Sequence, residues 1–539
     1  MDRTVRAHRP LIMGRNGAVA SNHPQATLAG MDVLRAGGNA VDAAAAVSLA
    51  LGVVEPGMSG LGGDGFFHVW MAETGNSHIY NGTGSAPSAA KPERFAEDGI
   101  PVVGPLSTST PGHLGGLSSM HAAHGVHAWP EVCAHSIRLA QEGFLVTHAY
   151  RHYAETARDR LVADPVSRVT LLDDGEIPAL GTAIQQPRLA ETLSQIATDG
   201  AESFYRGTLA DQVAKDMEAA GILVTAADLA AYQPEIQDAI AISYRGFEVR
   251  QTPPNSTGFV LLQELKIIEQ FDLTDKAYNS AEVIHLLVEA KKRAFRDRER
   301  HGADPRHTDI PIDRLLSEKY AADIAAEIDL GQAAEIPLST PQRADGDTTY
   351  FCVVDDQGNA VSAIQSINSA FGSGVTGRST GILFNNRMAY WHLDEAHANR
   401  LVPGKRVRHT MNAPIILRDG KLWAAFGTPG ADNQVQVNLQ IAVAMMDYDL
   451  DPQQAVEATR WASSQPGQGA NWPHDGDFGL TVEEGLDAGS IAGLRGRGHD
   501  VRFVAPLEGP CSVACIRVLE NGTRMAGSDP RRDGWAGAY

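Results

Sequence analysis

The sequence predicts an α+β fold in which helices dominate the first two thirds of the chain and antiparallel strands the last third. Most ordered segments before residue 330 have the residue pattern of helices. After residue 347, apolar runs are joined by tight turns at 356–359 and 419–420, as in β-hairpins. Hairpins pair their strands antiparallel, which argues against a doubly wound parallel sheet.

Two helices are predicted near the start of the chain. Residues 24–36 form the first, and Gly37 and Gly38 end it. Asn39 can cap the second, at 39–54, which is rich in alanine and almost uncharged. A helix without a polar face is expected to be buried on most sides.

A glycine-rich turn and a strand, FFHVW at 66–70, follow this second helix. Residues 60–65 match the letters of the GxGxxG dinucleotide-binding loop. That loop needs a strand before it and a helix after it, and here the order is reversed. A packed glycine turn is therefore the better interpretation.

The remaining elements follow from the same patterns. Further helices are predicted at 131–145, 189–221, 279–301, 311–329 and 433–447. Strands are predicted at 238–252 and 348–367, in a further pair from 411 onward, and at 509–527. A polar, turn-rich linker at 334–347 leads directly into the first C-terminal hairpin.

Composition excludes several classes of protein. Of the 539 residues, 43% are hydrophobic and 20% charged, which describes a globular chain with a substantial core rather than a disordered one. The formal net charge of −20 repels phosphate backbones, so we expect no nucleic-acid partner. No apolar stretch of about 18 residues occurs, so we expect no membrane span.

The location is expected to be cytoplasmic. The first twenty residues lack the apolar stretch of a secretory signal. The four cysteines are too few for a disulfide framework.

Two groups of metal-ligand residues are weak candidates for a metal site. His121, His124 and His127 recur every three residues, but Gly125 interrupts the helical face and no carboxylate or thiolate flanks them at ligand spacing. Cys511 and Cys515 lack a second ligand pair. We expect no metal and no organic cofactor.

Thr348 stands where the polar linker meets a buried strand. If the bond before it is cut, Thr348 carries both a hydroxyl nucleophile and an α-amine with an unperturbed pKa of about 7.7–8.0. Such an amine can accept the hydroxyl proton itself, so no separate histidine or aspartate is required. Threonine is common at strand starts, however, and the local pattern alone gives this hypothesis little weight.

Several long motifs resemble the γ-glutamyltransferase family. They lie at 37–66, 253–269, 348–362, 371–388, 427–434 and 527–539. This resemblance implies an N-terminal nucleophile hydrolase, with a four-layer αββα sandwich and a precursor that cuts itself before Thr348. It predicts a large subunit, 1–347, and a small catalytic subunit, 348–539, which together form one αββα unit.

The resemblance also assigns roles to individual residues. Thr348 matches the nucleophile, Thr349 the second threonine of a pair, and Ser366 a hydroxyl that hydrogen-bonds the nucleophile. Asn368 matches a residue that contacts substrate. Gly430 and Ala431 match the two oxyanion-hole positions, where backbone N–H groups are the donors.

The positions that recognise a γ-glutamyl group differ in this chain. Tyr390 replaces an aspartate that binds the substrate α-amino group, and Arg387 replaces a glutamine. His409 and Thr410 replace two serines that hold the α-carboxylate. Without an acid to balance Arg387, an α-ammonium about 4 Å away would be repelled by about 4 kcal/mol at an effective dielectric near 20.

The surrounding segment, 387–409, is basic. It has five arginine or lysine side chains against two acidic ones. Such a segment in an acidic protein favours an anion pocket, in which arginine can bind a carboxylate with two hydrogen bonds. Alternatively, these cations pair with acidic neighbours in the fold.

The sequence therefore predicts an amidohydrolase for small anionic amides, either oxamate-like or with a dicarboxylic acyl group, that forms an acyl ester on Thr348. One alternative is a γ-glutamyltransferase or γ-glutamyl (glutathione) hydrolase. A second alternative is an unprocessed, non-catalytic relative. The sequence leaves open whether water or an amine accepts the acyl group, and whether two processed heterodimers associate.

Overall fold

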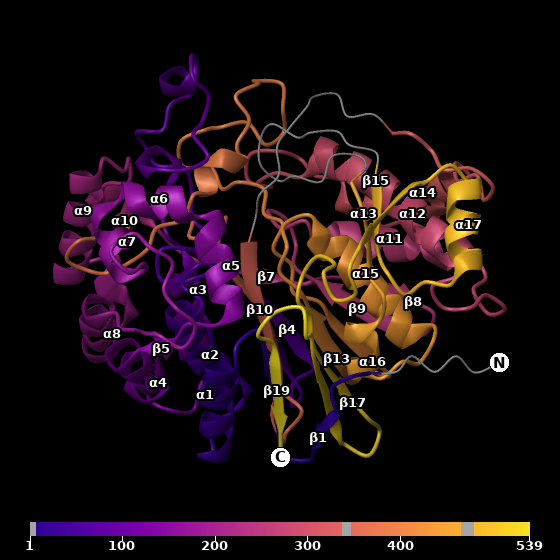
Figure 1. Ribbon diagram of the computed structural model, residues 1–539, viewed down its shortest axis with the longest axis horizontal. Helices are drawn as coiled ribbons and strands as arrows, with labels where there is room; N and C mark the ends of the chain where they lie inside the picture. Colours follow the sequence, from indigo (N-terminus) through magenta and orange to yellow (C-terminus); the bar gives the residue numbers. More distant parts are fainter. Residues whose placement is uncertain (1–6, 337–346, 465–478) are drawn as a thin grey trace.

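Two antiparallel sheets of seven strands lie face to face, and helices cover both outer faces (Figure 1). The computed structural model describes residues 7–336, 347–464 and 479–539. Helices α1 to α10 lie on one side of the sheets and α11 to α17 on the other (Figure 1). The predicted α+β class and the four-layer αββα sandwich are confirmed.

The first sheet has the strand order β19-β2-β10-β11-β3-β4-β7. Its strands are β2 (Ala18–Ser21), β3 (Asp64–Met71), β4 (Asn76–Gly82), β7 (Glu235–Asp238), β10 (Asp347–Val354), β11 (Ala360–Asn368) and β19 (Trp535–Ala538). The hairpin β10–β11 is inserted between β2 and β3, so strands from before and after residue 347 share one set of ladders.

The second sheet has the order β1-β18-β17-β13-β12-β9-β8. Its strands are β1 (Ile12–Gly14), β8 (Ile240–Tyr244), β9 (Phe247–Gln251), β12 (Ile415–Arg418), β13 (Lys421–Gly427), β17 (Ala514–Val518) and β18 (Arg524–Ser528). Two small sheets consist of β14 (Trp461–Ser463), β15 (Gly479–Glu483) and β16 (Asp500–Val504), and of β5 (Phe144–Leu145) and β6 (Ala183–Ile184).

The helices fall into two groups along the chain. The first comprises α1 (Pro24–Arg35), α2 (Ala40–Val54), α3 (His113–His124), α4 (Trp129–Glu142), α5 (His148–Thr156), α6 (Arg158–Ala163), α7 (Pro165–Thr170), α8 (Pro187–Asp199), α9 (Thr208–Ala220) and α10 (Ala226–Ala231). The second comprises α11 (Gly258–Glu269), α12 (Ala281–His301), α13 (Ile312–Leu315), α14 (Glu318–Ala325), α15 (Asn433–Met446), α16 (Pro452–Glu457) and α17 (Ala488–Gly496). Short 3-10 helices are η1 (Pro92–Phe95), η2 (Pro105–Ser107), η3 (Ala201–Phe204) and η4 (Arg387–Tyr390).

Three large buried clusters fill the three spaces between the layers. Along β10, Phe351 and Val353 point toward the first helix layer, whereas Tyr350 and Cys352 point between the two sheets. This alternation is the period-2 pattern of a strand that is covered on both faces. The third cluster packs the second sheet against α11, α12 and α15.

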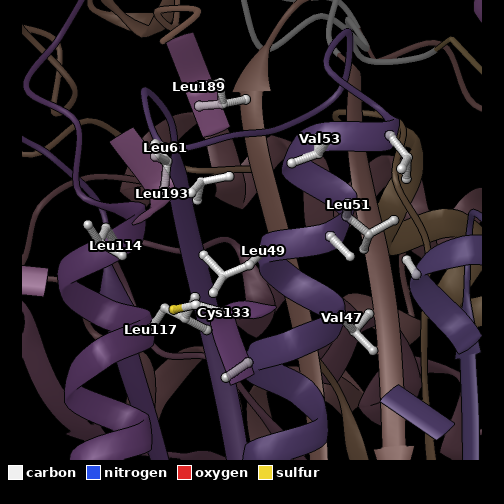
Figure 2. Packing of buried hydrophobic residues seen from close by; sticks show 14 of the residues in the cluster. Val47, Leu49, Leu51, Val53, Leu61, Leu114, Leu117, Cys133, Leu189 and Leu193 are labelled. Carbon is white, nitrogen blue, oxygen red and sulfur yellow. The ribbon is translucent and has the colours of Figure 1, made fainter. Parts of the chain in front are cut away.

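Helix α2 is buried as the sequence predicts. Every residue except Gly52 is buried, and the Asn39 side chain accepts the N–H groups of Val41 and Asp42. Figure 2 shows Val47, Leu49, Leu51 and Val53 of this helix among side chains of α3, α4 and α8.

The predicted glycine turn at 60–65 is confirmed as a site of close backbone packing. A Cβ on Gly62 would lie 2.2 Å from the Leu383 oxygen, and one on Gly63 would lie 2.4 Å from the Ser366 oxygen. Only glycine fits at such contacts, so this turn presses the start of β3 against β11.

Several predicted boundaries are wrong. The helix predicted at 189–221 is divided into α8 and α9, because Gly200 and Gly207 both adopt positive φ angles. The helix at 131–145 ends at Glu142, where Gly143 has φ 92° and a short strand follows. The helix at 311–329 is two short ones, α13 and α14.

Most of the predicted linker, at 337–346, lies outside the described residues. A search of the described part of the chain finds no helix with the length and apolar character needed to span a bilayer.

Candidate active site

Thr348 is the second residue of β10, and its side chain is buried. The pairing of β10 with β11 shifts between Asp347 and Thr349, so Thr348 sits in an irregular ladder position of the kind that re-aims a side chain. Its hydroxyl donates to Ser366 Oγ at 3.2 Å.

The Ser366 side chain connects the Thr348 hydroxyl to the peptide bond between Asp347 and Thr348. The Ser366 hydroxyl donates to the carbonyl oxygen of Asp347 at 2.7 Å and accepts the N–H of Asn368 at 2.8 Å. One hydroxyl therefore contacts both the candidate nucleophile and the carbonyl of the predicted cleavage bond.

Thr349 faces a carboxyl group that the sequence analysis missed. Its hydroxyl donates to Glu55 Oε2 at 2.7 Å. Burial raises the pKa of Glu55 to about 7, although the hydrogen bond from Thr349 opposes this shift. Glu55 comes from the end of α2, and nothing in its local sequence indicates this contact.

Arg532 holds the residue before Thr348. Its Nη2 lies 2.5 Å from Asp347 Oδ1, and its Nη1 donates to the Thr348 carbonyl at 3.4 Å. Its guanidinium lies 4.9 Å from the centre of the Tyr153 ring. Arg532 lies in the 527–539 motif, but the sequence does not indicate that its side chain contacts Asp347.

Gly430 and Ala431 lie between β13 and α15, with φ angles of 116° and 50°. A Cβ on Gly430 would lie 2.3 Å from Cys511 Sγ, so no side chain fits there. Their carbonyls accept N–H groups of the first turn of α15, where backbone N–H groups lack partners within the helix.

Packing and hydrogen bonds connect this turn to the start of β10. Gly427, at the end of β13, packs against the ring of Tyr350, two residues after Thr348. Ser512 donates its N–H to Thr428 and its hydroxyl to Asn22, and Asn22 in turn donates to Thr349. The predicted oxyanion-hole positions, Gly430 and Ala431, are therefore connected to the start of β10 through these contacts.

The predicted substrate-binding residues Asn368, Arg387 and Tyr390 are brought together. Arg387 Nη1 donates to Asn368 Oδ1 at 3.3 Å, and its guanidinium lies 4.7 Å from the centre of the Tyr390 ring. The Thr410 side chain hydrogen-bonds Tyr390. All four side chains are buried.

Asp64 corrects the predicted charge balance around Arg387. The sequence analysis placed no acid beside Arg387, but Asp64 Oδ2 lies 3.2 Å from Arg387 Nε. Burial raises the pKa of Asp64 to about 6, and Arg387 opposes this shift. Because the two charges offset each other, the electrostatic argument against an α-ammonium group no longer holds.

His409 lies near the same carboxylate oxygen of Asp64 as Arg387. Its Nε2 is 3.7 Å from Asp64 Oδ2, and neither ring nitrogen has a hydrogen-bond partner among the described residues. Burial, with the nearby charges of Arg387 and Arg406, holds the pKa of His409 well below its usual value. His409 is therefore neutral near pH 7.

The rest of the basic segment follows the alternative interpretation. Arg406 pairs with Glu235 at 2.7 Å and Arg408 with Glu299 at 3.1 Å. Arg400 and Lys405 donate to backbone carbonyls at 3.1 and 2.6 Å. Arg387 is thus the member of this segment that the structure places beside Asn368.

The described residues include two groups with metal-ligand atoms close together. In one, His285, Glu289 and His499, the carboxylate already pairs with Lys292 and Arg293 at 2.7 Å, which disfavours a cation. In the other, Glu299, His392 and His397, the two imidazole rings stack in parallel 3.5 Å apart, so their in-plane lone pairs do not converge.

The predicted weak metal candidates make separate contacts. His121 bonds Asp42 at 3.0 Å, and His124 bonds the Tyr80 hydroxyl at 2.7 Å. Cys511 lies beside Gly430, whereas Cys515 contacts Met445.

An αββα sandwich with a threonine at the start of a central strand is the arrangement of N-terminal nucleophile hydrolases. The gamma-glutamyltranspeptidase family model matches residues 26–539, and the chain belongs to this family. The predicted family and enzyme class are confirmed.

Individual relatives cover nearly the whole chain. A glutathione hydrolase-like YwrD proenzyme of Bacillus subtilis is 37% identical over 97% of this chain and 99% of its own length. An oxamate amidohydrolase proenzyme of Klebsiella pneumoniae is 34% identical, covering 97% and 98%. The crystal structure of a cephalosporin acylase from Bacillus halodurans matches with a TM-score of 0.90 and 33% identity, covering 99% and 98%.

Proposed function

We propose that this protein is a self-processing N-terminal-threonine amidohydrolase for small amides whose acyl group carries a carboxylate. The observation that carries the proposal is the position of Ser366, whose hydroxyl contacts both Thr348 Oγ and the Asp347 carbonyl. Both relatives described above are named as proenzymes, which supports processing.

Self-cleavage would proceed by attack of Thr348 Oγ on the carbonyl carbon of Asp347. The Ser366 hydroxyl donates to the carbonyl oxygen as negative charge develops there. The C–N bond breaks, its nitrogen takes the hydroxyl proton, and water then hydrolyses the resulting ester. The products are chains 1–347 and 348–539, which remain together because β10 and β11 lie between β2 and β3.

Processing supplies the base for turnover. In the precursor the Thr348 nitrogen is an amide and cannot accept a proton, whereas the free α-amine has a pKa of about 7.7–8.0. Thr348 Oγ then attacks the substrate carbonyl, and its proton passes through the α-amine to the leaving ammonia or amine. Water hydrolyses the acyl ester in the second half, while the N–H groups of Gly430 and Ala431 stabilise each oxyanion.

Arg387 would bind the acyl carboxylate. Its Nη2 is buried and has no hydrogen-bond partner among the described residues. Buried donors without partners are costly, so a carboxylate oxygen that reaches Nη2 gains a charged hydrogen bond. Asn368, Tyr390, His409 and Thr410 complete this pocket, and the oxamate amidohydrolase relative supports a short acyl group.

A γ-glutamyl hydrolase or transferase is the second candidate. The presence of Asp64 beside Arg387 favours it, because an α-ammonium group would find an acid there. The glutathione hydrolase-like relative supports the same substrate class.

Intact mass of freshly purified protein under denaturing conditions tests the proposal. Two species of residues 1–347 and 348–539 are expected, and Thr348→Ala should leave a single chain. An amide panel of oxamate, a glutaryl anilide and a γ-glutamyl anilide then separates the two candidates. A wild-type chain that stays whole would favour the unprocessed, non-catalytic alternative.

A further inference from the structure

Asp432 directly follows the predicted oxyanion-hole positions and stands at the N-cap of α15. An aspartate at this position usually accepts N–H groups of the first helical turn, but the Asp432 side chain makes no such hydrogen bond. It is buried instead, and its Oδ1 lies 2.7 Å from Nη1 of Arg298, in the last turn of α12. The carboxylate therefore connects the start of α15 to another helix.

The turn before Asp432 presents two backbone donors in a strained conformation. The N–H groups of Gly430 and Ala431 have no hydrogen-bond acceptor among the described residues. Ala431 has φ 50°, a left-handed conformation that costs free energy for a residue with a Cβ and persists only where surrounding contacts enforce it. The carbonyls of both residues accept the N–H groups of Asn433 and Gln434 at 2.9 and 3.1 Å. A contact that holds Asp432 therefore also holds the two donors.

Arg298 belongs to a cluster of four charged side chains. Its Nη2 donates to Glu299 Oε1 at 2.5 Å, and its guanidinium lies 4.3 Å from the centre of the Phe295 ring. The same oxygen of Glu299 accepts Nη1 of Arg408 at 3.1 Å. Asp432, Arg298, Glu299 and Arg408 thus alternate in charge, and their formal charges cancel.

Such a cluster is better suited to fixing a conformation than to adding stability. The cost of desolvating buried charges offsets much of their attraction, and apolar replacements of a whole pair are often neutral. Moving one partner away leaves an uncompensated buried charge, which is strongly unfavourable. Asp432 is therefore confined to one position, and the adjoining Gly430–Ala431 turn is confined with it.

We propose that Asp432 is a positioning residue for turnover: its ion pair with Arg298 fixes the Gly430–Ala431 turn so that both N–H groups meet the substrate oxyanion. The inference rests on the proposed function, in which these N–H groups stabilise the oxyanions of acyl transfer. Asp432 acts through the turn and not through contact with substrate. In self-cleavage the hydroxyl of Ser366 is the donor, so this step should not depend on Asp432.

The test measures self-cleavage, kcat and KM in Asp432→Asn, which removes the charge and keeps the shape of the side chain. Self-cleavage should proceed at the wild-type rate. With the amide of the panel that wild type hydrolyses fastest, kcat should fall about tenfold or more, because a single lost oxyanion donor costs roughly 10²–10³ in rate. KM should stay within about twofold of wild type, since the lost interaction is made only in the transition state. A wild-type kcat, or an equal slowing of self-cleavage, would refute the proposal.

Asp447→Asn is the matched control, because Asp447 lies at the opposite end of α15. Its side chain is 2% exposed, and its Oδ1 lies 2.7 Å from Arg245 Nη1. This variant should lower Tm and leave kcat and KM unchanged. An equal fall of kcat in both variants would show that lost stability explains the effect, and would overturn the role of Asp432.

A second variant covers the case in which Asp432→Asn does not fold because Arg298 is left unpaired. The double variant Asp432→Asn/Arg298→Met removes both charges and leaves Glu299 paired with Arg408. Its kcat should also fall about tenfold or more, with self-cleavage at the wild-type rate. A double variant with the wild-type kcat would contradict the proposal.

Hydrogen exchange tests the turn without turnover. Exchange at Asn433 and Gln434 reports the turn, because their N–H groups donate to its two carbonyls. Mass spectrometry of a peptic peptide that covers these residues should show faster exchange in Asp432→Asn but not in Asp447→Asn. If wild type hydrolyses no amide of the panel, the proposed function fails, whereas faster exchange would still support the role of Asp432. Unchanged exchange would overturn it.

Discussion

Replacing Ser366 by alanine should slow self-cleavage, and the decrease in rate should be larger than the accompanying loss of stability can explain. The Ser366 hydroxyl contacts Thr348 Oγ at 3.2 Å, the Asp347 carbonyl at 2.7 Å and the Asn368 N–H at 2.8 Å. Removing one donor to a developing oxyanion costs roughly 10²–10³ in rate. Leaving the buried Asn368 N–H without an acceptor costs about 1–3 kcal/mol of stability.

A matched control separates these two effects. Ser362 is buried on the same face of β11, and its hydroxyl contacts the Tyr350 hydroxyl at 2.6 Å, but it touches neither Thr348 nor Asp347. Ser362→Ala should therefore lower stability by a similar amount and leave cleavage near the wild-type rate. Ser366→Thr, which keeps the hydroxyl, should restore cleavage.

The assay is a time course of intact mass after rapid purification, with thermal denaturation measured on the same samples. The expected result is uncleaved Ser366→Ala protein over a period in which wild type and Ser362→Ala are fully cut. Cleavage of Ser366→Ala at the wild-type rate, or equal slowing in Ser362→Ala, would refute the relay from Thr348 through Ser366 to the scissile carbonyl.

Further predictions concern the residues around Thr348 and Arg387. Arg387→Ala should raise KM for a carboxylate-bearing amide about tenfold or more, because a charged hydrogen bond contributes about 1.5–3 kcal/mol. Steady-state kinetics check this prediction. A neutral amide serves as the control substrate, and its KM should not change. The rate of turnover should fall as pH drops below the pKa of the Thr348 α-amine, and a rate that is flat from pH 5 to 9 would contradict its role as base. Arg532→Ala should slow self-cleavage several-fold, because Arg532 orients Asp347 through the 2.5 Å contact. A gel time course at fixed temperature measures the rate. An unchanged rate would show that the contact is only structural. Burial raises the pKa of Glu55 from 4.5 to about 7. The contribution of Glu55 to the free energy of unfolding is therefore fully present below pH 4.5 and is lost as pH rises through 7. The Tm of Glu55→Gln relative to wild type should therefore increase between pH 5 and 8, and a constant difference would show that Glu55 does not titrate in this range.

Local sequence patterns predict much of the fold. The almost uncharged, alanine-rich composition of α2 predicts a helix buried on most sides, and the turns at 356–359 and 419–420 predict hairpins. These features depend on residues close in the chain. The breaks at Gly143, Gly200 and Gly207 were missed because a glycine in a helical pattern is ambiguous until its φ is known.

The hypotheses that Thr348 is a nucleophile and that Arg387 binds a carboxylate also came from sequence alone. What the sequence could not provide is the set of partners that these residues meet. Asp64 is separated from Arg387 by 323 residues, and Glu55 from Thr349 by 294. No spacing rule links such positions.

Only the tertiary structure decided the balance of charge around Arg387. The sequence determined that Arg387 replaces a neutral residue and that the segment around it is basic. Strand register places Asp64 opposite Ser366. The packing of residues 387–409 brings Arg406 and Arg408 to acidic residues that are far away in the sequence, Glu235 and Glu299. Electrostatic energy depends on distance and burial, and both are set by which strands and helices meet.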